Sequence, residues 1–513
     1  MKWKQLSLGM AIILLLVSLA ACSKKPQENS SQPNSSQENS SQANSSAENS
    51  QATAPELEKV NLIWYTLGDT HDDDKEVFDK ASAIVEEKIN ATLEFVPIAM
   101  GEYAQKMQLK AAGNEKFDLC YTSDWLFTYK DNVDKGAFIA IDELIDQYAK
   151  ETADMIPDTI WNGVKINGKI YGVPNYQVSF RYPALVFLKD VVDELGLQEE
   201  IAAIKTMSDL TPIFEKVKAN RPDLSMTTIP PDYNKFDYGD MDNYWETVST
   251  VAVDSDLKVV PLDSAEYLER KQADYALARE WYEKEYFPAD VSVGGINTSD
   301  LTSAGKLFMW EDVYKPGVEA DMKTRYGYDV YVQPMGQPVL STGSITATVT
   351  AVSRTSENPE RAMMLINLVN TDKELYNLLV FGEEGKHYTK ESDTRIKVTS
   401  GYSGLAWAIG CQFNAYLVDG QDDDVWEETK RLNGEAKMSH LLGFYFDDTN
   451  VKDQIANVGA VEGTFATGGT YGLLPIEEEK EVQAKMTQAK MDAGYQDIMD
   501  ELQRQLDQWK TQK

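Results

Sequence analysis

The pattern of apolar and polar positions begins with an apolar run from Leu8 to Ala21, which follows the positive charges of Lys2 and Lys4. At a rise of about 1.5 Å per residue, this run is too short to cross the roughly 30 Å of hydrocarbon in a bilayer. A short apolar run behind a basic N-terminus is typical of a secretory signal peptide. We therefore expect residues 1–21 to be a signal peptide and not part of the fold.

A polar repeat follows the apolar run. Four consecutive five-residue units, each beginning with Gln and ending in Asn-Ser-Ser, start at Gln27, Gln32, Gln37 and Gln42. Such a sequence has no apolar side chain large enough to build a core, so it predicts a flexible tether. We expect this tether to occupy residues 22–56.

After the tether, apolar positions recur with spacings that alternate between those of strands and helices. Short runs rich in β-branched and aromatic residues predict strands, and apolar residues three and four positions apart predict helices. The predicted order is strand 61–65, helix 72–90, strand 92–98, helix 103–112 and strand 117–121. This alternation is typical of a parallel sheet flanked by helices. Ligands of such sheets lie beyond the carboxyl ends of the strands, which here are residues 65–69 and 122–125.

The net charge of the chain makes two classes of binding partner unfavourable. The sequence has 83 Asp and Glu against 49 Lys and Arg, a formal net charge of −34. This excess of acid disfavours nucleic acid as a partner, because phosphate backbones are held by clustered Lys and Arg. It also disfavours adsorption of the folded part to an anionic membrane, so any membrane attachment needs another device.

Such a device is indicated by Leu19-Ala20-Ala21-Cys22, which resembles the lipobox of bacterial lipoproteins. The resemblance implies that the thiol of Cys22 receives a diacylglycerol and that the peptide is cut just before it. Acyl chains contribute about 0.8 kcal/mol per buried CH₂, which anchors an acidic protein without a basic patch. The alternative is a secreted protein with a small residue at its cleavage site.

Catalytic side chains are sparse. The chain has three histidines, His71, His387 and His440, and no histidine-centred constellation supports Ser-His-Asp chemistry. We expect His387 to be a structural histidine hydrogen-bonded to the backbone. Cys120 and Cys411 show no metal-ligand spacing; they could form a disulfide, although two separate buried cysteines are favoured.

Acidic runs at 72–74 and 422–424 raise the question of a calcium site. In the loop that starts at Asp419, Asp424 stands where an EF-hand requires Gly and Lys430 where it requires Glu. We therefore interpret both runs as solvated acidic turns and assign no metal. Pairs of carboxylates suited to glycoside hydrolysis arise by chance among so many acids and indicate little.

Longer phrases carry a specific resemblance. The chain reads Gly168-Lys-Ile-Tyr-Gly-Val-Pro174, then has an apolar stretch at 183–188, and continues with Lys189-Asp-Val-Val-Asp-Glu-Leu-Gly196. In this order, these phrases resemble the extracellular solute-binding proteins of ABC importers, family 1. The resemblance implies an α/β, two-lobed, periplasmic-binding-protein-like fold with a cleft between the lobes. It places the first phrase just before the first crossing from one lobe to the other.

The C-terminal part is similar to a lipoprotein subgroup of this family that carries an extra C-terminal domain of unknown function. The similarity rests on the phrase at 381–388 and the tail at 493–509. Apolar residues of the tail share one helical face and predict a helix docked on a lobe: Tyr495, Ile498, Leu502, Leu506 and Trp509. Upstream, Pro359 predicts the first turn of a helix, and Thr371 with Glu374 predicts a capping box for the next one.

The resemblance also implies a domain organisation. The expected boundaries are 57–178 for the first part of lobe 1, 179–343 for a segment mostly in lobe 2, and 344–513 for the return to lobe 1 and an added helical C-terminal segment.

Aromatic and polar residues near the predicted strand ends and family phrases are candidate ligand contacts. An aromatic ring can pack against the apolar face of a sugar, while carboxylates and amides hydrogen-bond its rim of hydroxyl groups. The candidates are Tyr65, Asp69, Asp124, Trp125, Tyr176, Gln177, Trp245, Trp310, Glu311 and Trp407. Asp124, Trp125 and Trp310 are the strongest candidates. The first two lie just after a predicted strand, and Trp310 ends the stretch Ala304-Gly-Lys-Leu-Phe-Met-Trp310, which also resembles the family. For any single aromatic residue, packing in the core is the alternative.

The resemblance implies a binding protein and not an enzyme. We expect a lipid-anchored protein on the extracellular face of the cell membrane that captures a carbohydrate, with an oligosaccharide as the expected ligand, and delivers it to the permease subunits of an ABC importer. This role needs no cofactor, no metal and no nucleic acid, and it involves the membrane only through the N-terminal lipid. The alternatives are a surface-tethered glycoside hydrolase with two catalytic carboxylates, and a peptide-binding or adhesive lipoprotein.

Overall fold

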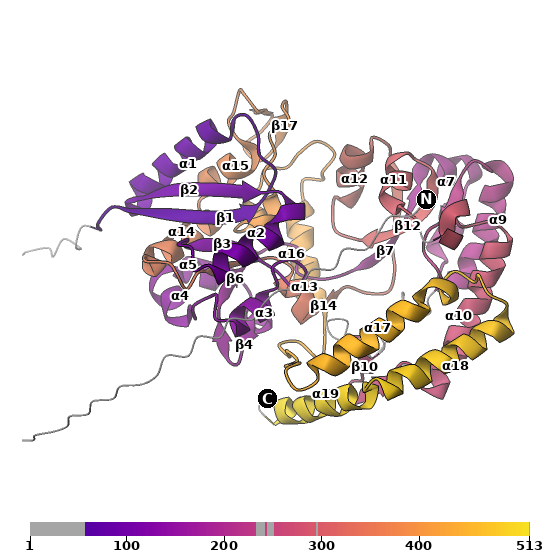
Figure 1. The fold of residues 1–513 in the computed structure, drawn as a ribbon. Coiled ribbons are helices and arrows are strands. Elements are labelled where there is room, and N and C mark those ends of the chain that lie inside the picture. Colours follow the sequence, from indigo (N-terminus) through magenta and orange to yellow (C-terminus); the bar gives the residue numbers. More distant parts are fainter. Residues whose placement is uncertain (1–56, 232–241, 244–250, 294–295, 512–513) are drawn as a thin grey trace, which may run out of the picture. The chain divides into compact units, whose positions relative to one another are not determined.

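The computed structural model describes residues 57–231, 242–243, 251–293 and 296–511 (Figure 1). The expectations for the signal peptide, Cys22 and the tether lie outside these residues. Over the described ranges, the structure contains no helix both long and apolar enough to cross a bilayer. Two larger mixed sheets, each with its own hydrophobic core, and three long C-terminal helices dominate the described part.

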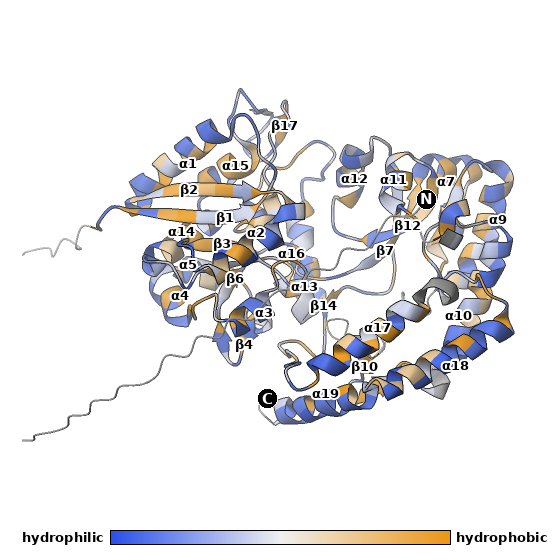
Figure 2. Ribbon diagram, in the orientation of Figure 1, coloured by the Kyte–Doolittle hydropathy of each residue, from blue (hydrophilic) through white to orange (hydrophobic). Residues whose placement is uncertain are grey.

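The first sheet confirms the predicted strand–helix alternation. Its strands, in spatial order, are β2 (Ala91–Ile98), β1 (Val60–Leu67), β3 (Leu119–Thr122), β15 (Val349–Val352) and β6 (Gly172–Pro174). The strands β2, β1 and β3 run parallel, and β15 runs antiparallel to both of its neighbours. The central strands are apolar because helices cover both faces of the sheet (Figure 2).

Helices lie on both faces of this sheet. They include α1 (Asp74–Ile89), α2 (Met100–Ala112), α14 (Pro359–Thr371) and α15 (Lys373–Phe381). Trp64 and Tyr65 are neighbours in β1, so their side chains point to opposite faces. Trp64 packs against Phe95, which in turn contacts Phe78 of α1. The Lys110 ammonium of α2 lies over the ring of Tyr65, 4.6 Å from the centre of that ring.

The residue that caps α15 differs from the predicted one. Pro359 occupies the first turn of α14, as predicted. The cap of α15, however, is Asp372 and not Thr371. Its Oδ1 accepts the backbone N–H groups of Glu374 and Leu375 at 2.9 and 3.0 Å. A carboxylate suits this position because it also meets the positive end of the helix dipole.

Shorter elements complete the part of the chain around the first sheet. These are α3 (Tyr129–Asp134), α4 (Asp142–Tyr148), α5 (Lys150–Met155), α6 (Asp158–Gly163), β4 (Lys165–Ile166), β5 (Lys169–Ile170), β14 (Val339–Leu340), α13 (Thr342–Thr346), β16 (Tyr388–Lys390), β17 (Ile396–Val398), η4 (Ala406–Ala408), η5 (Gln412–Asn414), α16 (Val425–Glu435) and β18 (Lys437–Met438). The strand β14 pairs with β18, so the chain before α13 lies beside the chain after α16.

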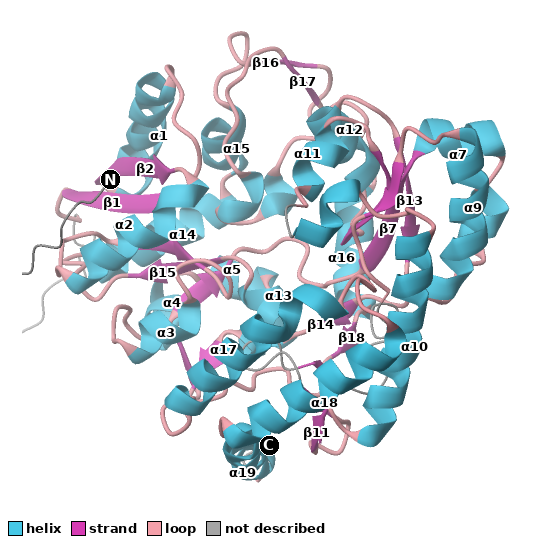
Figure 3. Cartoon of the chain, turned by 45° about the vertical axis from the view of Figure 1, so that its right-hand side comes forward, coloured by secondary structure: helices cyan, strands magenta, loops and turns pink. Residues whose placement is uncertain are grey.

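The second sheet has the strand order β13 (Val330–Pro334), β7 (Pro183–Leu188), β12 (Leu307–Val313) and β8 (Ser225–Thr227). Figure 3 shows β13 beside β7. The predicted strand at 183–188 is therefore confirmed as β7. Other elements of this part are α7 (Lys189–Leu195), α8 (Gln198–Ala202), η1 (Met207–Asp209), α9 (Leu210–Asn220), α10 (Ala265–Glu283), η3 (Ala289–Val293), α11 (Thr298–Ser303) and α12 (Val318–Tyr326). A separate small sheet has the order β11 (Val259–Pro261), β10 (Val251–Val253) and β9 (Asp242–Asn243).

The C-terminal helices form a third core with part of the small sheet. These helices are α17 (Lys452–Gly469), α18 (Ile476–Asp492) and α19 (Tyr495–Lys510); α17 packs against both of the others, and α19 follows α18 almost end to end in Figure 1. The predicted apolar face of α19 is buried here, because Ile498, Leu502 and Leu506 pack with Val251 and Val253 of β10. Trp509 packs its ring against Phe444 at a centroid distance of 5.4 Å. The added helical C-terminal segment is therefore confirmed.

Two kinds of contact hold the C-terminal region to the rest of the chain. On the side of the first sheet, the N–H of Gly443 donates to Thr342 Oγ1 at 2.8 Å, and the hydroxyl of Tyr445 donates to the carbonyl of Gly163 at 2.6 Å. On the side of the second sheet, the aromatic ring of Tyr471 belongs to the core that surrounds β7 and β12. The C-terminal region therefore contacts elements packed on both large sheets.

A buried ion cluster adds to this attachment. Lys490 of α18 is fully buried, and its Nζ lies 2.5 Å from Asp263 Oδ2 and 3.3 Å from Glu462 Oε1. Asp263 also meets Lys271 at 3.3 Å, and the Lys490 ammonium lies 4.3 Å from the ring centre of Tyr495. Charges are buried only where partners compensate them, so these side chains fix how α18 meets the segment before α10.

The cysteines and His387 occupy structural positions. Cys120 and Cys411 are both buried and free, which excludes the disulfide between them. The ring of His387 is 1% exposed, and its Nδ1 accepts the N–H of Glu383 at 2.8 Å. His387 Nε2 then donates to Asp73 at 3.1 Å. The prediction of a histidine hydrogen-bonded to backbone is confirmed.

Candidate functional site

Three aromatic rings gather at the carboxyl end of β3. Trp125 and Trp407 have their ring centres 6.4 Å apart, and Tyr121 lies 6.4 Å from the first and 6.1 Å from the second. We call Tyr121, Trp125 and Trp407 the aromatic cluster. Tyr121 is fully buried, Trp407 is half-buried, and Trp125 is 47% exposed. The cluster therefore has a buried base and an indole that faces solvent.

A single backbone carbonyl holds two of these rings. Ala347 accepts a hydrogen bond from Trp125 Nε1 at 3.0 Å and another from the Tyr121 hydroxyl at 2.9 Å. Ala347 follows α13, whose first turn is closed by a capping box at Ser341. The exposed indole is thus fixed by its polar edge, which leaves its face open.

Asp124 lies next to this indole in an unusual environment. Its backbone N–H donates to the carbonyl of Thr346 at 2.9 Å. Its Oδ1 is buried and has no hydrogen-bond partner among the described residues. Burial raises the pKa of this carboxyl to about 6, and the nearby charge of Arg181 opposes that rise. An under-satisfied carboxylate of this kind accepts hydroxyl donors readily.

Gln177, on the segment that follows β6, lies close to the same stretch of backbone. Its Nε2 donates to Thr348 Oγ1 at 3.1 Å, and its carbonyl accepts Asn433 Nδ2 at 2.7 Å. The three residues from Thr346 to Thr348 therefore gather Asp124, the aromatic cluster and Gln177 around one short stretch of backbone. Arg181, four residues beyond Gln177, precedes the first strand of the second sheet.

Other predicted site residues lie elsewhere. Tyr65 is not at the end of a strand, because β1 continues to Leu67, and its ring faces α2 and Phe117. Tyr176 is 7% exposed and packs edge to face on Phe413 at 4.8 Å. Both rings therefore serve packing in this structure.

Trp310 and Glu311 lie within β12 and not after it. Trp310 is 3% exposed and belongs to the core of the second sheet, so its expected role at the surface is not supported. The strand pairs Trp310 with Val186 and Glu311 with Leu185. Glu311, which is half-buried, points to the opposite face from Trp310. Trp245 lies outside the described residues.

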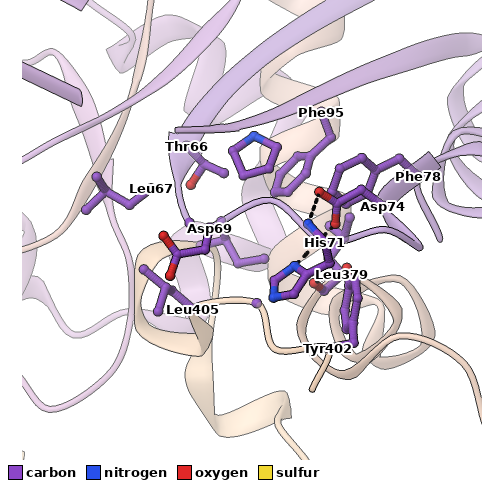
Figure 4. Close-up of a pocket in the computed structure, with 14 residues that line it drawn as sticks. Thr66, Leu67, Asp69, His71, Asp74, Phe78, Phe95, Leu379, Tyr402 and Leu405 are labelled. Carbon is purple, nitrogen blue, oxygen red and sulfur yellow. Dashed lines mark hydrogen bonds and ion pairs between the residues drawn. The ribbon is translucent and has the colours of Figure 1, made fainter. Parts of the chain in front are cut away.

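Asp69 is exposed and stands at the mouth of a pocket beyond the ends of β1 and β2 (Figure 4). The other polar residues of this pocket include His71, whose backbone N–H donates to Asp74 Oδ2 at 2.8 Å. Tyr402 lies against His71 with a centroid distance of 5.0 Å. We call this feature the first-sheet pocket; it is lined by Thr66, Leu67, Gly68, Asp69, His71, Asp74, Phe78, Phe95, Pro97, Leu379, Tyr402, Gly404, Leu405 and Ile409.

Some functional positions were missed by the sequence reasoning. Tyr121 lies in a predicted strand, and its place under Trp125 depends on Ala347, which is far away in the sequence. Arg181 carries a positive charge just before the chain enters the second sheet. A charged residue at that point of the sequence could have been identified as a candidate. The described residues contain no group of three or more His, Cys, Asp or Glu arranged to hold a metal ion.

Comparison with known proteins extends this description. A family model for the bacterial extracellular solute-binding proteins matches residues 69–375, and a model for a domain of unknown function matches residues 440–511. A carbohydrate ABC transporter substrate-binding protein of Streptococcus pneumoniae is 26% identical over 462 residues, which cover 88% of this chain and 91% of the relative.

Comparison with solved structures also identifies solute-binding proteins. The N-glycan transport solute binding protein of Streptococcus pneumoniae matches with a TM-score of 0.76 at 25% identity, covering 89% of this chain and 100% of the other. The same protein in complex with Man5GlcNAc matches with a TM-score of 0.67 at 25% identity, covering 89% and 99%.

These matches confirm the predicted two-lobed α/β fold, with the helical C-terminal segment as a separate matched domain. The first family model spans more than half of the chain, from just after β1 into α15, and so includes the second sheet, the strands of the first sheet other than β1, and the residues around Ala347. The chain therefore belongs to the bacterial extracellular solute-binding proteins.

Proposed function

We propose that this chain is the substrate-binding component of an ABC importer and that it captures a carbohydrate, specifically an oligosaccharide, beside the aromatic cluster. It is a binding protein and not an enzyme. After binding, it delivers the sugar to the membrane-embedded permease subunits, while a separate subunit hydrolyses ATP.

One observation carries this proposal: an exposed indole lies next to a buried carboxylate oxygen that has no hydrogen-bond partner within the described part of the chain. The open face of Trp125 suits the C–H face of a sugar ring, and Asp124 Oδ1 suits a hydroxyl on its rim. A ligand with many hydroxyl groups satisfies both requirements together. A peptide of ordinary composition offers fewer donors for a carboxylate.

The relatives support the same ligand class. The similar protein of Streptococcus pneumoniae is a carbohydrate ABC transporter substrate-binding protein, and the solved N-glycan transport protein has been crystallised with Man5GlcNAc. The resemblance covers both large sheets and the C-terminal domain, so it supports a shared mode of action along the whole folded part.

Capture would proceed by selection of a closed form. Asp124 and Trp125 lie in the loop that follows β3 of the first sheet, while Arg181 lies on the segment that leads to the second sheet, so a ligand between them contacts both sides. A sugar that contacts both lobes binds the closed form more tightly than the open form and shifts the population toward it. The permease then distinguishes loaded from empty protein by this shape.

Lipid anchoring explains how an acidic protein remains near its permease. The proposed diacylglycerol on Cys22 and the tether of residues 22–56 would hold the folded part at the extracellular face of the membrane. Replacing Cys22 with Ser tests this proposal. The variant should be released into the medium, whereas wild type remains in the membrane fraction; equal release of both proteins would contradict the anchor.

The decisive test of function is a glycan array followed by calorimetry on the soluble form that begins after Cys22. We expect binding of oligosaccharides with a dissociation constant near micromolar, about −8.2 kcal/mol. Mass spectrometry of the bound glycans after incubation should show them intact. Shortened glycans would favour the glycoside hydrolase, and binding of peptides without any glycan would overturn the proposal.

A further inference from the structure

Two glycines lie where the parts of the chain around the two large sheets touch outside the segments that cross between them. Gly317 precedes α12, and a Cβ on it would lie 3.1 Å from Val425 Cγ2 at the start of α16. A Cβ on Gly420 would lie 3.1 Å from the Cβ of Ala320 in α12. Both glycines also have a positive φ, which side chains disfavour. We call the packing of Gly317 and Ala320 on Gly420 and Val425 the α12 contact.

The two sides of the α12 contact belong to different cores. Val318 and Met322 of α12 are buried in the core of the second sheet. Trp426, next to Val425 in α16, packs on the core of the first sheet, and its Nε1 donates to the carbonyl of Ala415 at 3.0 Å. The contact therefore joins the two lobes by packing alone, so a rotation of one lobe against the other can break it.

The loop that carries Gly420 is fixed on the side of the first sheet. Arg395 donates to the carbonyls of Val418 and Gln421 at 2.9 and 2.7 Å. The side-chain oxygen of Gln421 accepts the N–H of Val418 at 3.1 Å. These bonds hold the loop without any help from α12, so the loop is a preformed surface on which the other lobe can close.

Two carboxylates lie close together at the edge of this contact. Glu319 precedes Ala320, and Asp422 lies two residues after Gly420. Partial burial raises the pKa of Glu319, and the negative charge of Asp422 raises it further. In the part of the chain that the structure describes, neither carboxylate has an ion-pair partner, because Lys315 and Arg395 nearby pair with other acids. Forming the α12 contact therefore brings uncompensated like charges together.

We propose that the α12 contact forms when the lobes close and that Glu319 and Asp422 act on it as an electrostatic brake. In the empty protein, their repulsion keeps the closed form rare. A captured sugar supplies the differential affinity that overcomes the repulsion. The permease then meets few closed molecules without cargo. This inference rests on the proposed function, but its test uses the protein without any sugar.

Trapping the contact tests whether it belongs to the closed form. The soluble form that begins after Cys22 has only two thiols, and both are buried. Ala320→Cys with Gly420→Cys should form a disulfide on oxidation, because the two Cβ positions lie near the separation that a disulfide needs. Small-angle X-ray scattering should then give a smaller radius of gyration than for the reduced form. Equal radii would overturn the inference, because the contact would be present in both forms.

A second pair of cysteines avoids the backbone strain at Gly420. Glu319→Cys with Asp422→Cys, bridged by a short bismaleimide, should give the same radius of gyration as the oxidised first pair. Circular dichroism and melting temperature show whether each variant is folded. Failure of both pairs to cross-link would overturn the inference, because the contact would not form in solution.

Single-molecule energy transfer tests the brake. Dyes on Glu143→Cys of α4 and Glu194→Cys of α7 report the separation of the lobes. Glu319→Gln should raise the closed fraction of the empty protein about threefold, because one charge of the repelling pair is lost. Asp422→Asn should do the same, and the double change should add little, because either change alone removes the repulsion.

The control variant is Glu87→Gln in α1, a helix that takes no part in the α12 contact. It removes one exposed negative charge and should leave the closed fraction unchanged. If Glu319→Gln and Asp422→Asn behave as Glu87→Gln does, the brake is absent and the inference fails. The glycan array reports separately on the proposed function, which would survive the loss of the brake.

Discussion

Trp125 donates its indole N–H to the carbonyl oxygen of Ala347 at 3.0 Å, although its side chain is 47% exposed. A large aromatic ring that is fixed before binding loses little rotamer entropy when a ligand stacks on it. The same carbonyl also holds Tyr121 below the indole. The geometry of the open ring is therefore set by the fold and not by the ligand.

The first prediction concerns this ring. Trp125→Ala should weaken binding of an array-identified oligosaccharide tenfold or more, about 1.4 kcal/mol, because stacking area is lost. The melting temperature should change little, since the indole is half exposed. Calorimetry and thermal unfolding on the same preparation measure both effects.

Trp310 offers the matched control. Its side chain is 3% exposed in the core of the second sheet, and a change to Ala removes a large buried ring. We expect a loss of about 3–5 kcal/mol in unfolding free energy, with sugar affinity retained by the protein that stays folded. The reverse pattern, a destabilised Trp125→Ala with intact affinity, would assign Trp125 to the core.

The difference between these two tryptophans also shows what the sequence can predict. The strand–helix order of the first sheet follows from apolar spacing, and β1, β2 and β3 form as predicted. Strand ends are less certain, because β1 and β12 continue past Tyr65 and Trp310, and alternation then decides which side chains are buried. No local pattern marks Trp310 as inward-facing and Trp125 as outward-facing.

The site itself depends on backbone groups that the sequence does not mark. Trp125 is fixed by the carbonyl of Ala347, which lies 222 residues away, and Gln177 by Thr348, which lies 171 residues away. Any residue has a carbonyl, so only the fold identifies this one. The family phrases placed the correct segments near each other, but they could not choose the contacts.

The second prediction concerns the pH dependence of binding. Burial raises the pKa of Asp124 to about 6 in the free protein. Sugar hydroxyls donate to the ionised carboxylate, so bound ligand lowers this pKa and affinity falls as pH drops through 6. We expect affinity about tenfold lower at pH 5 than at pH 7.5, measured by calorimetry.

The Asp124→Asn variant tests whether this carboxyl, and not another one in the chain, causes the pH dependence. The variant should bind with an affinity that is flat between pH 5 and 7.5. For stability the sign is opposite: a raised folded pKa makes the carboxyl favour the folded state as pH falls from 6 toward 4. The melting temperature of wild type relative to Asp124→Asn should therefore rise over that interval. A wild-type affinity that does not change with pH would remove Asp124 from the site.

The third prediction concerns the thiols. Cys120 and Cys411 are buried, and burial raises the pKa of both thiols, that of Cys411 to about 11. In the soluble form that begins after Cys22, Ellman's reagent at pH 8 should titrate neither thiol in the folded protein and both in urea. Rapid reaction of the folded protein would place a thiol at the surface. No reaction in urea until reductant is added would indicate a disulfide.

The last prediction concerns the buried cluster that attaches the C-terminal helices. Lys490→Met removes the buried ammonium that Asp263 meets at 2.5 Å and Glu462 at 3.3 Å, and Asp263 keeps the partly exposed Lys271. Breaking a buried pair on one side costs about 3–5 kcal/mol, so we expect a loss of this size in urea unfolding followed by circular dichroism.

Two further variants give this prediction its controls. Lys480→Met removes an exposed partner of Glu477, at 2.8 Å, and should cost less than about 1 kcal/mol. The double change of Lys490→Met with Asp263→Leu removes both charges of the buried pair and leaves the partly exposed Glu462 and Lys271, so it should recover part of the lost stability. If the single change costs no more than Lys480→Met, then Lys490 is hydrated in solution and the cluster does not fix α18. In that case, the apolar core around α19 and the contacts of Tyr445 would hold the C-terminal region in place, and truncation of α19 would be the more damaging change.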